Sequence, residues 1–209
     1  MINILCYGDS NTYGFNPENG TRFDANTRWT GVLGKLLGSS FSVIEAGMNN
    51  RTGFFDNPDG IAQSGAKHLP ECLKNCDKID ICVLGLGAND LQFIFDINED
   101  VVEKGLKRLI SHIKEYSKEA EIILVTPPIL FKNLLDGYFA CQFDEKSIEN
   151  SKKIKPIYKK VAENENCNLI EIDKFVTPSE SDGLHFSAES HKIIGKVIAE
   201  KITQITSSD

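Results

Sequence analysis

The sequence predicts an α/β fold in which a parallel sheet is covered by helices. Short apolar runs alternate with longer amphipathic stretches along the 209 residues, and some of the runs have no polar face. Strands that are apolar on both faces are typical of parallel sheets buried between crossover helices. Hydrophobic residues make up 41% of the chain, and no shift in composition divides it. We therefore expect a single domain over residues 1–209.

Five apolar runs are the predicted strands. Each is short and is bounded by residues typical of turns, which favours a strand over a buried helix. The first run, INILCY, lies almost at the start of the chain, and the third, IDICVLGLG, is apolar on both faces. The five runs cover residues 2–7, 41–47, 79–87, 120–128 and 167–173.

Amphipathic stretches between and after these runs are the predicted helices. Their apolar residues recur at helical spacing, and Gly38 is a stop signal for the first of them. Pro70 predicts a kink or a break in the second, because proline lacks the N–H that a helix interior needs. The predicted helices cover residues 29–38, 61–76, 97–118, 145–166 and 187–205.

Composition and charge exclude several classes of protein. The net charge is −7, which argues against a general nucleic-acid binder. The densest group of lysines, in residues 152–160, is interpreted as the solvated face of a helix. No apolar run reaches 18 residues and no signal-peptide pattern opens the chain, so we expect a cytoplasmic protein without a membrane partner.

No motif for a metal or a cofactor is apparent. The six cysteines form no CxxC pair and are interpreted as reduced thiols, and the four histidines show no HExxH spacing. GLGAND lacks the third glycine of a dinucleotide-binding motif, and neither a P-loop nor a GxSxG elbow occurs. We expect no metal and no cofactor.

Reactive side chains follow the predicted strands where the strands end. In an open parallel sheet these ends share one edge, where ligands bind. Ser10 follows the first strand, Asn50 the second, Asn89 the third, and Asp182 and His185 the fifth. Acyl transfer needs this set: a hydroxyl, a base that takes its proton, a carboxylate that orients the base, and donors for an oxyanion.

Each of these residues also has a structural interpretation. Ser10 could be the N-cap of a helix, since serine is favoured there. Asn89 could be a turn or cap residue, Asp182 a turn residue beside Gly183, and His185 an exposed residue at a helix start. The other histidines, at positions 68, 112 and 191, are interpreted as surface or structural residues on helices. Because all of these residues are predicted to lie at one edge of the sheet, a shared catalytic role is favoured over the separate structural interpretations.

Three segments together resemble the blocks of the SGNH hydrolases, also called the GDSL esterases and lipases. GDSNTYG resembles the block that supplies the nucleophile, which implies that role for Ser10. GLGAND resembles the block whose asparagine side chain binds the oxyanion, which implies Asn89. DGLHFS resembles the block with the catalytic acid and base, which implies Asp182 and His185. The blocks occur in the family's order from position 8 to position 187.

The second block, EAGMNNRTG, is the weakest match. The oxyanion-hole glycine of the family aligns best with Asn50, whose backbone N–H can serve in a suitable conformation. Gly47 is the alternative donor. The resemblance thus implies an oxyanion hole made of the Ser10 N–H, the Asn50 N–H and the Asn89 side chain.

The resemblance also implies a flavodoxin-like, three-layer α/β/α sandwich with a five-stranded parallel sheet. RFDANTRWTGVL and NNRTG look like the arylesterase and acyltransferase branch, which implies a homo-oligomer acting on small esters with short acyl groups. A carbohydrate O-acetyl esterase, a thioesterase or a lysophospholipase could use the same site. A non-catalytic, flavodoxin-like binding module is the alternative from another class.

Two irregular segments, residues 12–29 and 129–145, follow strand ends and are rich in large side chains. We expect their aromatic residues either to pack ordinarily or to wall a narrow acyl pocket. These residues are Tyr13, Phe15, Phe23, Trp29, Phe131, Tyr138, Phe139 and Phe143.

Overall fold

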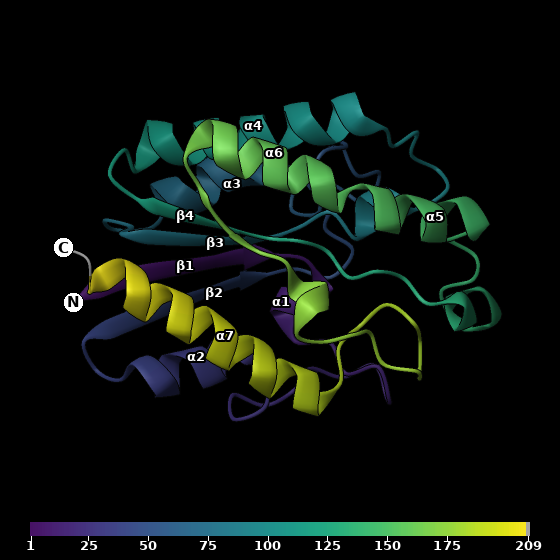
Figure 1. Ribbon diagram of the computed structural model, residues 1–209, viewed down its shortest axis with the longest axis horizontal. Helices are drawn as coiled ribbons and strands as arrows, with labels where there is room; N and C mark the ends of the chain where they lie inside the picture. Colours follow the sequence, from purple (N-terminus) through teal and green to yellow (C-terminus); the bar gives the residue numbers. More distant parts are fainter. Residues whose placement is uncertain (208–209) are drawn as a thin grey trace.

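The computed structural model describes residues 1–207 and has a five-stranded, all-parallel sheet with the strand order β2-β1-β3-β4-β5 (Figure 1). This order makes β1 the point where the chain reverses direction across the sheet, which is where such folds bind ligands. The strands are β1 Ile2–Gly8, β2 Phe41–Gly47, β3 Ile81–Gly85, β4 Glu121–Val125 and β5 Asn168–Ile170.

Helices cover both faces of the sheet, so the predicted α/β/α sandwich is confirmed (Figure 1). One face packs against α3 Gly65–Lys74, α4 Glu99–Tyr116, α5 Glu145–Lys153 and α6 Lys155–Glu165. The other face packs against α2 Trp29–Leu37 and α7 Ala188–Thr206. Four short helical turns complete the fold: α1 Ser10–Tyr13, η1 Asn89–Leu91, η2 Lys132–Asp136 and η3 Ile172–Lys174.

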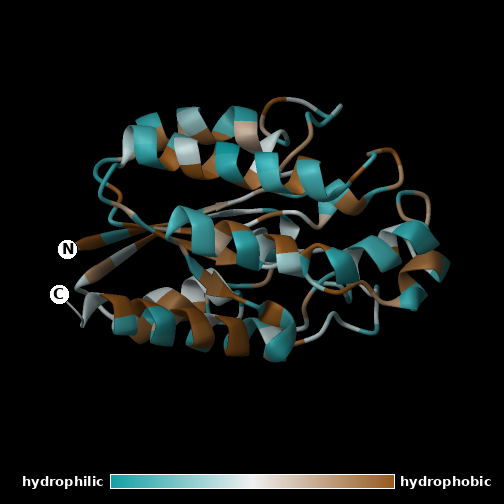
Figure 2. Ribbon diagram, turned by 45° about the horizontal axis from the view of Figure 1, so that its top comes forward, coloured by the Kyte–Doolittle hydropathy of each residue, from teal (hydrophilic) through white to brown (hydrophobic). Residues whose placement is uncertain are grey.

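Two apolar cores hold the layers together, one on each side of the sheet. Leu5 and Leu84 face the larger core with Leu106, whereas Ile4 and Val83 face the smaller one. Neighbouring strand residues thus point to opposite faces, and both faces are buried. Figure 2 shows the result as brown residues along the strands and mixed brown and teal along the covering helices.

Proline explains two differences between the predicted and the observed helices. The predicted helix over residues 145–166 is divided at Ile154, because Pro156 cannot donate a helical hydrogen bond and is tolerated only in the first turn of the second helix. Of the kink or break predicted at Pro70, the break is wrong, because α3 continues through Pro70 to Lys74. The third, fourth and fifth strands are also shorter than predicted at both ends, because their outermost predicted residues lie in the flanking loops and, after β5, in η3.

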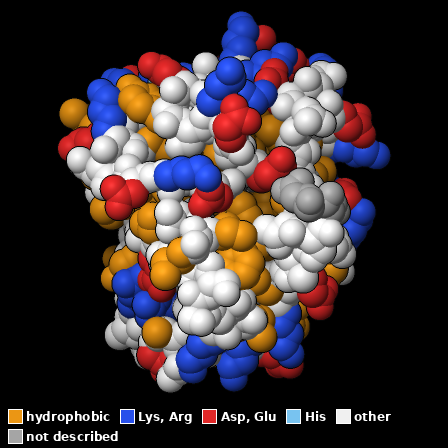
Figure 3. Space-filling model, turned by 90° about the vertical axis from the view of Figure 1, so that its left-hand side faces the viewer, with side chains coloured by type: hydrophobic (Ala, Val, Ile, Leu, Met, Phe, Trp, Pro, Cys, Tyr) orange, Lys and Arg blue, Asp and Glu red, His pale blue; other side chains and the backbone are white. Residues whose placement is uncertain are grey.

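The face at the N-terminal ends of the strands lies opposite the end of the sheet that carries the predicted site. Figure 3 shows this face with acidic and basic side chains interspersed around a limited apolar area. None of the helices within residues 1–207 combines the length and apolar character needed to cross a bilayer. All six cysteines are free thiols.

Candidate active site

The turn after β1 places Ser10 at the C-terminal edge of the sheet. A side chain at Gly8 would overlap the carbonyl oxygen of Gly85, since a Cβ there would lie 2.5 Å from it, so only glycine fits where β1 meets the turn. Asp9 is the N-cap of α1, and its carboxylate accepts a hydrogen bond from the Asn11 N–H at 2.9 Å. The capping interpretation of Ser10 is therefore wrong: Asp9 caps the turn and leaves the Ser10 hydroxyl available.

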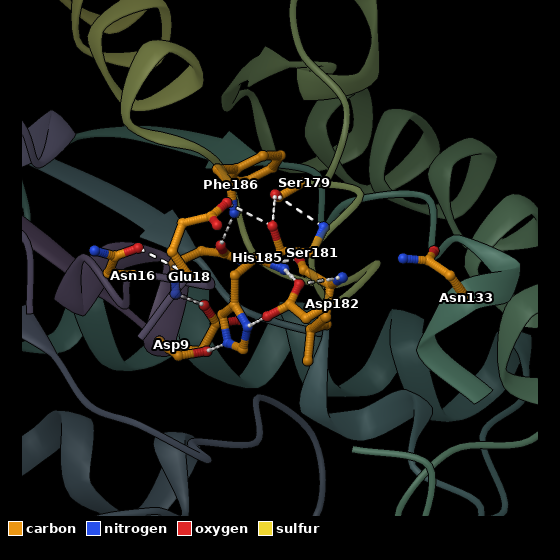
Figure 4. Close-up of polar contacts among 12 residues, drawn as sticks. Asp9, Asn16, Glu18, Asn133, Ser179, Ser181, Asp182, His185 and Phe186 are labelled. Carbon is orange, nitrogen blue, oxygen red and sulfur yellow. Dashed lines mark hydrogen bonds and ion pairs between the residues drawn. The ribbon is translucent and has the colours of Figure 1, made fainter. Parts of the chain in front are cut away.

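Ser10, His185 and Asp182 form a continuous hydrogen-bonded chain. The Ser10 Oγ lies 2.8 Å from His185 Nε2, and His185 Nδ1 lies 2.6 Å from Asp182 Oδ2. An ionised carboxylate only accepts hydrogen bonds, so Nδ1 carries the proton in neutral His185 and Nε2 accepts from the serine hydroxyl. Figure 4 shows His185 between Asp182 and the turn that carries Asp9. The three residues, predicted from the ends of the first and the fifth strand, thus meet.

The Asp182 carboxylate is fixed by its own loop. Its Oδ1 accepts hydrogen bonds from the backbone N–H groups of Leu184 and His185, both at 2.9 Å. Burial opposes ionisation, but the hydrogen bonds from the His185 ring and from these N–H groups prevail and lower the pKa of Asp182 below its ordinary value. Asp182 is therefore an anion at neutral pH, oriented to hold a protonated imidazole.

Asn50 and Asn89, the two predicted oxyanion donors, lie in one hydrogen-bonded network. Asn50 has φ +59°, a left-handed conformation that asparagine tolerates better than most residues. The Asn89 Nδ2 donates to the carbonyl of Arg51 at 3.1 Å, which joins η1 to the loop after β2. Within residues 1–207, neither the Ser10 N–H nor the Asn50 N–H donates to a protein acceptor.

Gly47, the alternative to Asn50, has a different place in the fold. It is the last residue of β2 and pairs with Gly8 of β1. A Cβ on Gly47 would lie 2.1 Å from the backbone nitrogen of Tyr13, so this glycine allows α1 to pack against the strand. This close packing accounts for Gly47 without a role as a hydrogen-bond donor.

Comparison with known proteins agrees with this geometry. The family model of the GDSL-like lipases and acylhydrolases matches residues 6–193. The chain belongs to this family. As an acylhydrolase of the family, it is a hydrolase of carboxylic ester bonds. A comparison with curated protein sequences gives no match.

Solved structures similar to this GDSL-family chain include esterases of nearly the same length. An aryl esterase from M. smegmatis is 27% identical, with a TM-score of 0.90 over 98% of this chain and 99% of that one. A carbohydrate acetylesterase from Sinorhizobium meliloti is 26% identical, with a TM-score of 0.89 over 98% and 100%. The predicted resemblance and fold class are thus confirmed.

In this GDSL-family chain a cavity of about 420 Å³ opens beside Asp182 and the His185 ring. Phe15 and Phe139 line it, and their ring centroids lie 4.3 Å and 5.3 Å from that of His185. Tyr138 forms its outer edge and is 88% exposed. Glu18 and Asn19 add polar groups to the same wall. The cavity can therefore accept a small group with both apolar and polar surfaces.

The aromatic residues predicted to wall the acyl pocket divide into three sets. Phe15, Tyr138 and Phe139 line the cavity. Trp29 and Phe143 are buried, and the indole N–H of Trp29 donates to the Asn11 carbonyl at 3.0 Å. The remaining three do not line it: Tyr13 lies under the Arg22 guanidinium, Phe23 packs against His191, and Phe131 donates its backbone N–H to Gly183.

Glu18 connects the cavity wall to the loop that carries Asp182. Its Oε1 accepts a hydrogen bond from the Ser181 hydroxyl at 2.5 Å, and Ser181 also receives one from Ser179 at 3.1 Å (Figure 4). The loop that carries Asp182 and His185 is thereby held against the segment that begins at Phe15. This contact joins segments 163 residues apart.

Three further polar residues support the site and were not assigned a role from the sequence. The Asp90 carboxylate accepts hydrogen bonds from the N–H groups of Gly53, Phe54 and Phe55, which fixes the loop after β2. Arg51 is buried beneath that loop, and Gln92 contacts both Asn50 and Asn89. The spacing of Gln92, three residues after Asn89, was the available signal, since residues i and i+3 share one side of a helical turn.

Burial also raises the pKa of Asp9 to about 7, although a hydrogen bond from the Asn11 N–H opposes the shift. The carboxyl precedes Ser10 and caps α1, so its role is structural.

Within residues 1–207, no group of three or more His, Cys, Asp or Glu side chains is arranged to hold a metal ion.

Proposed function

We propose that this chain is a serine esterase that hydrolyses, or transfers, short acyl groups of carboxylic esters through an acyl-enzyme on Ser10. The observation that carries the proposal is the chain of contacts from Ser10 Oγ through His185 to Asp182, at 2.8 Å and 2.6 Å. Both distances are within the range in which a base activates a hydroxyl and a carboxylate orients the base.

Acylation begins when His185 Nε2 takes the proton of the Ser10 hydroxyl. The oxygen attacks the ester carbonyl carbon, and Asp182 stabilises the imidazolium without itself taking the proton. As the tetrahedral intermediate collapses, His185 gives the proton to the leaving alcohol. The product is an ester between the acyl group and Ser10.

Deacylation uses the same residues. His185 takes a proton from a water molecule or from a second alcohol, whose oxygen then attacks the acyl-enzyme. Collapse returns the proton to Ser10 Oγ and releases an acid or a new ester. In both steps the negative oxygen is bound by the Ser10 N–H, the Asn50 N–H and the Asn89 side chain, which strengthen their hydrogen bonds in the transition state.

A carbohydrate O-acetyl ester is a second candidate substrate, and the lining of the cavity favours it. Aromatic rings stack on the apolar faces of sugars, whereas carboxylates and amides bind hydroxyl groups. Phe15 and Phe139 supply the rings, and Glu18 and Asn19 the polar groups. The similarity to a carbohydrate acetylesterase supports this candidate.

The test of the proposal is covalent labelling combined with turnover. A fluorophosphonate probe should add one label per wild-type chain, and peptide mapping should find it on Ser10. The Ser10→Ala variant should remain folded, take up no label and lose about four orders of magnitude in kcat on p-nitrophenyl acetate. Ser39→Ala, an exposed serine after α2, is the matched control. Near-normal turnover by Ser10→Ala would refute the proposal.

A homo-oligomer is proposed as well, on the family resemblance. Light scattering on the purified chain tests it directly. A mass that stays at 23.2 kDa over a hundredfold range of concentration would contradict it.

A further inference from the structure

We propose that Gln92 is a positioning residue that sets the orientation of both oxyanion donors, Asn50 and Asn89, through a relay of side-chain amides that begins at Asp59. The inference rests on the proposed function of the site. It goes beyond that function because it assigns a role to residues that would contact neither the ester nor the nucleophile.

Gln92 bridges the two donor residues with one NH₂ group. Its Nε2 lies 2.8 Å from Asn50 Oδ1 and 3.3 Å from Asn89 Oδ1. The side chain is 5% exposed, so few water molecules can replace these partners. An amide nitrogen has two hydrogens, and here each one points to a different donor residue.

The orientation of the Asn89 amide decides whether it can bind an oxyanion. An asparagine amide turned by 180° has almost the same shape, but it presents an oxygen where the nitrogen was. In the observed orientation Asn89 Nδ2 donates to the Arg51 carbonyl and keeps its second N–H for the site. In the turned orientation, Asn89 Oδ1 would face the Arg51 carbonyl and Asn89 Nδ2 would face Gln92 Nε2. Both contacts would be repulsive.

At the outer end of the relay, the Asp59 carboxylate can only accept hydrogen bonds, and this fixes the direction in which the amides of the relay point. Asn50 Nδ2 donates to the carboxylate of Asp59, so Asn50 must present Oδ1 to Gln92. Gln92 must then present Nε2, whose second hydrogen faces Asn89 Oδ1. Asn89 is left with its nitrogen toward the site. Each amide orientation follows from the one before it.

The same contacts hold the backbone of Asn50. Its left-handed conformation is less favourable than a right-handed one and persists only where the surroundings enforce it. Its carbonyl accepts from Asn57 Nδ2 at 2.6 Å, while its side chain is held by Asp59 and Gln92. Loss of the Gln92 side chain would therefore make the positions of both the Asn50 N–H and the Asn89 amide less fixed.

The experiment is a double-mutant cycle on Gln92 and Asn89. Gln92→Met keeps the length of the side chain and removes both donors. We expect kcat on p-nitrophenyl acetate to fall about 10- to 100-fold with KM changed less than threefold, because the contacts matter mainly in the transition state. In the Asn89→Ala background the same change should cost markedly less, because part of its effect passes through Asn89.

Gln142→Met is the matched control. Gln142 lies against the same loop, since its carbonyl accepts from the Phe93 N–H, but its side chain does not contact either donor. It should retain wild-type kcat. Asp59→Ala is the second variant. Asp59 is exposed, so its replacement should lower kcat several-fold with an unchanged melting temperature.

The outcomes separate this proposal from the proposed function. If the wild type turns over and Asn89→Ala is impaired, but Gln92→Met stays within twofold of wild type, the relay is refuted and the esterase is not. An effect confined to KM, or full additivity with Asn89→Ala, also refutes it. If Gln92→Met does not fold, an unchanged kcat of Asp59→Ala refutes the relay. A wild type that neither hydrolyses esters nor takes up the probe refutes the function itself.

Discussion

Arg51 donates a hydrogen bond to the carbonyl of Gly8 at 3.1 Å, and so fixes the strand end that leads to Ser10. The guanidinium also donates to the carbonyls of Ala46 at 2.6 Å and Ala62 at 2.9 Å, and lies over the ring of Tyr7. One buried cation thus joins the ends of β1 and β2 to the loop before α3. Burial lowers the pKa of Arg51, but the carbonyls and the ring replace water around the charge.

Arg51→Met should destabilise the fold strongly. It leaves three carbonyl groups without their charged donor at a buried position, which costs about 3 kcal/mol or more in the free energy of unfolding. Urea denaturation followed by circular dichroism measures the loss. Lys78→Met is the control: this side chain is 77% exposed in its pair with Asp80, so a change within about 0.5 kcal/mol is expected. An equally small effect at Arg51 would contradict its anchoring role.

Asn89→Ala should lower kcat by roughly 10²- to 10³-fold, with a smaller change in KM. The amide N–H that faces the site strengthens its hydrogen bond only when the oxyanion forms. Steady-state kinetics on p-nitrophenyl acetate measure both constants. Asn98→Ala removes the N-cap of α4, nine residues after Asn89, and should cost about 1 kcal/mol of stability with kcat unchanged. A change in KM alone would make Asn89 a residue that binds the ground state.

Activity should depend on a neutral His185 held by an ionised Asp182. The ratio kcat/KM should rise between acidic and neutral pH, because only a neutral imidazole can take the Ser10 proton. Asp182 does not add a second ionisation there, because its pKa lies below the ordinary value for aspartate. Asp182→Asn should depress the rate but leave slow labelling of Ser10 by the fluorophosphonate probe. A profile that is flat from about pH 5 to pH 9 on a slow substrate would count against the assignment.

The fold and the site differ in how far the sequence predicts them. The strands were predictable because each is a short apolar run bounded by turn residues, and the rule that ligands bind at strand ends brought Ser10, Asp182 and His185 together. Arg51 was not predictable as a core residue, because an arginine in a loop is expected at the surface. Its burial depends on carbonyls supplied by three separate segments. The direction of the Gln92 side chain likewise depends on contacts that no local pattern encodes.

His191 should make the stability of the protein depend on pH. Its ring is fully buried, and Nδ1 accepts from the Trp29 N–H at 3.3 Å. Burial lowers the pKa of His191 to about 3. Between this value and the pKa of about 6.5 of an exposed histidine, the unfolded chain therefore binds the extra proton. The free energy of unfolding should fall as the pH drops below about 6.5, by at most about 1.4 kcal/mol per pH unit from this residue.

His191→Asn isolates this contribution, because its side-chain oxygen can replace Nδ1 as an acceptor and it does not titrate. Urea denaturation of the variant at several pH values between 5 and 7 should give a shallower slope than the wild type, whatever the loss in absolute stability. His112→Asn, at a partly exposed ring, should change the slope less. Equal slopes for His191→Asn and the wild type would show that the buried ring is protonated in the fold.

Acyl-chain length should be limited by the cavity beside the triad. Phe15 and Phe139 stand against the His185 ring, and Tyr138 closes the outer edge, so added methylenes meet side chains at van der Waals contact. Each added methylene then forgoes the roughly 0.8 kcal/mol of binding free energy that its burial would otherwise supply. Acetate and propionate esters should have higher values of kcat/KM than octanoate and longer esters. The series is measured with one leaving group, below the concentration at which micelles form.

Tyr138→Ala tests whether the aromatic wall sets this limit. The side chain is 88% exposed, so its loss should leave the fold intact while the cavity opens outward. The ratio of kcat/KM for octanoate to that for acetate should rise, because the longer chain gains room and the acetyl group, which lies next to Ser10, does not. If the wild type instead shows a steady rise in kcat/KM out to ten or more carbons, the wall does not restrict the acyl chain. The substrate would then be a long-chain lipid ester.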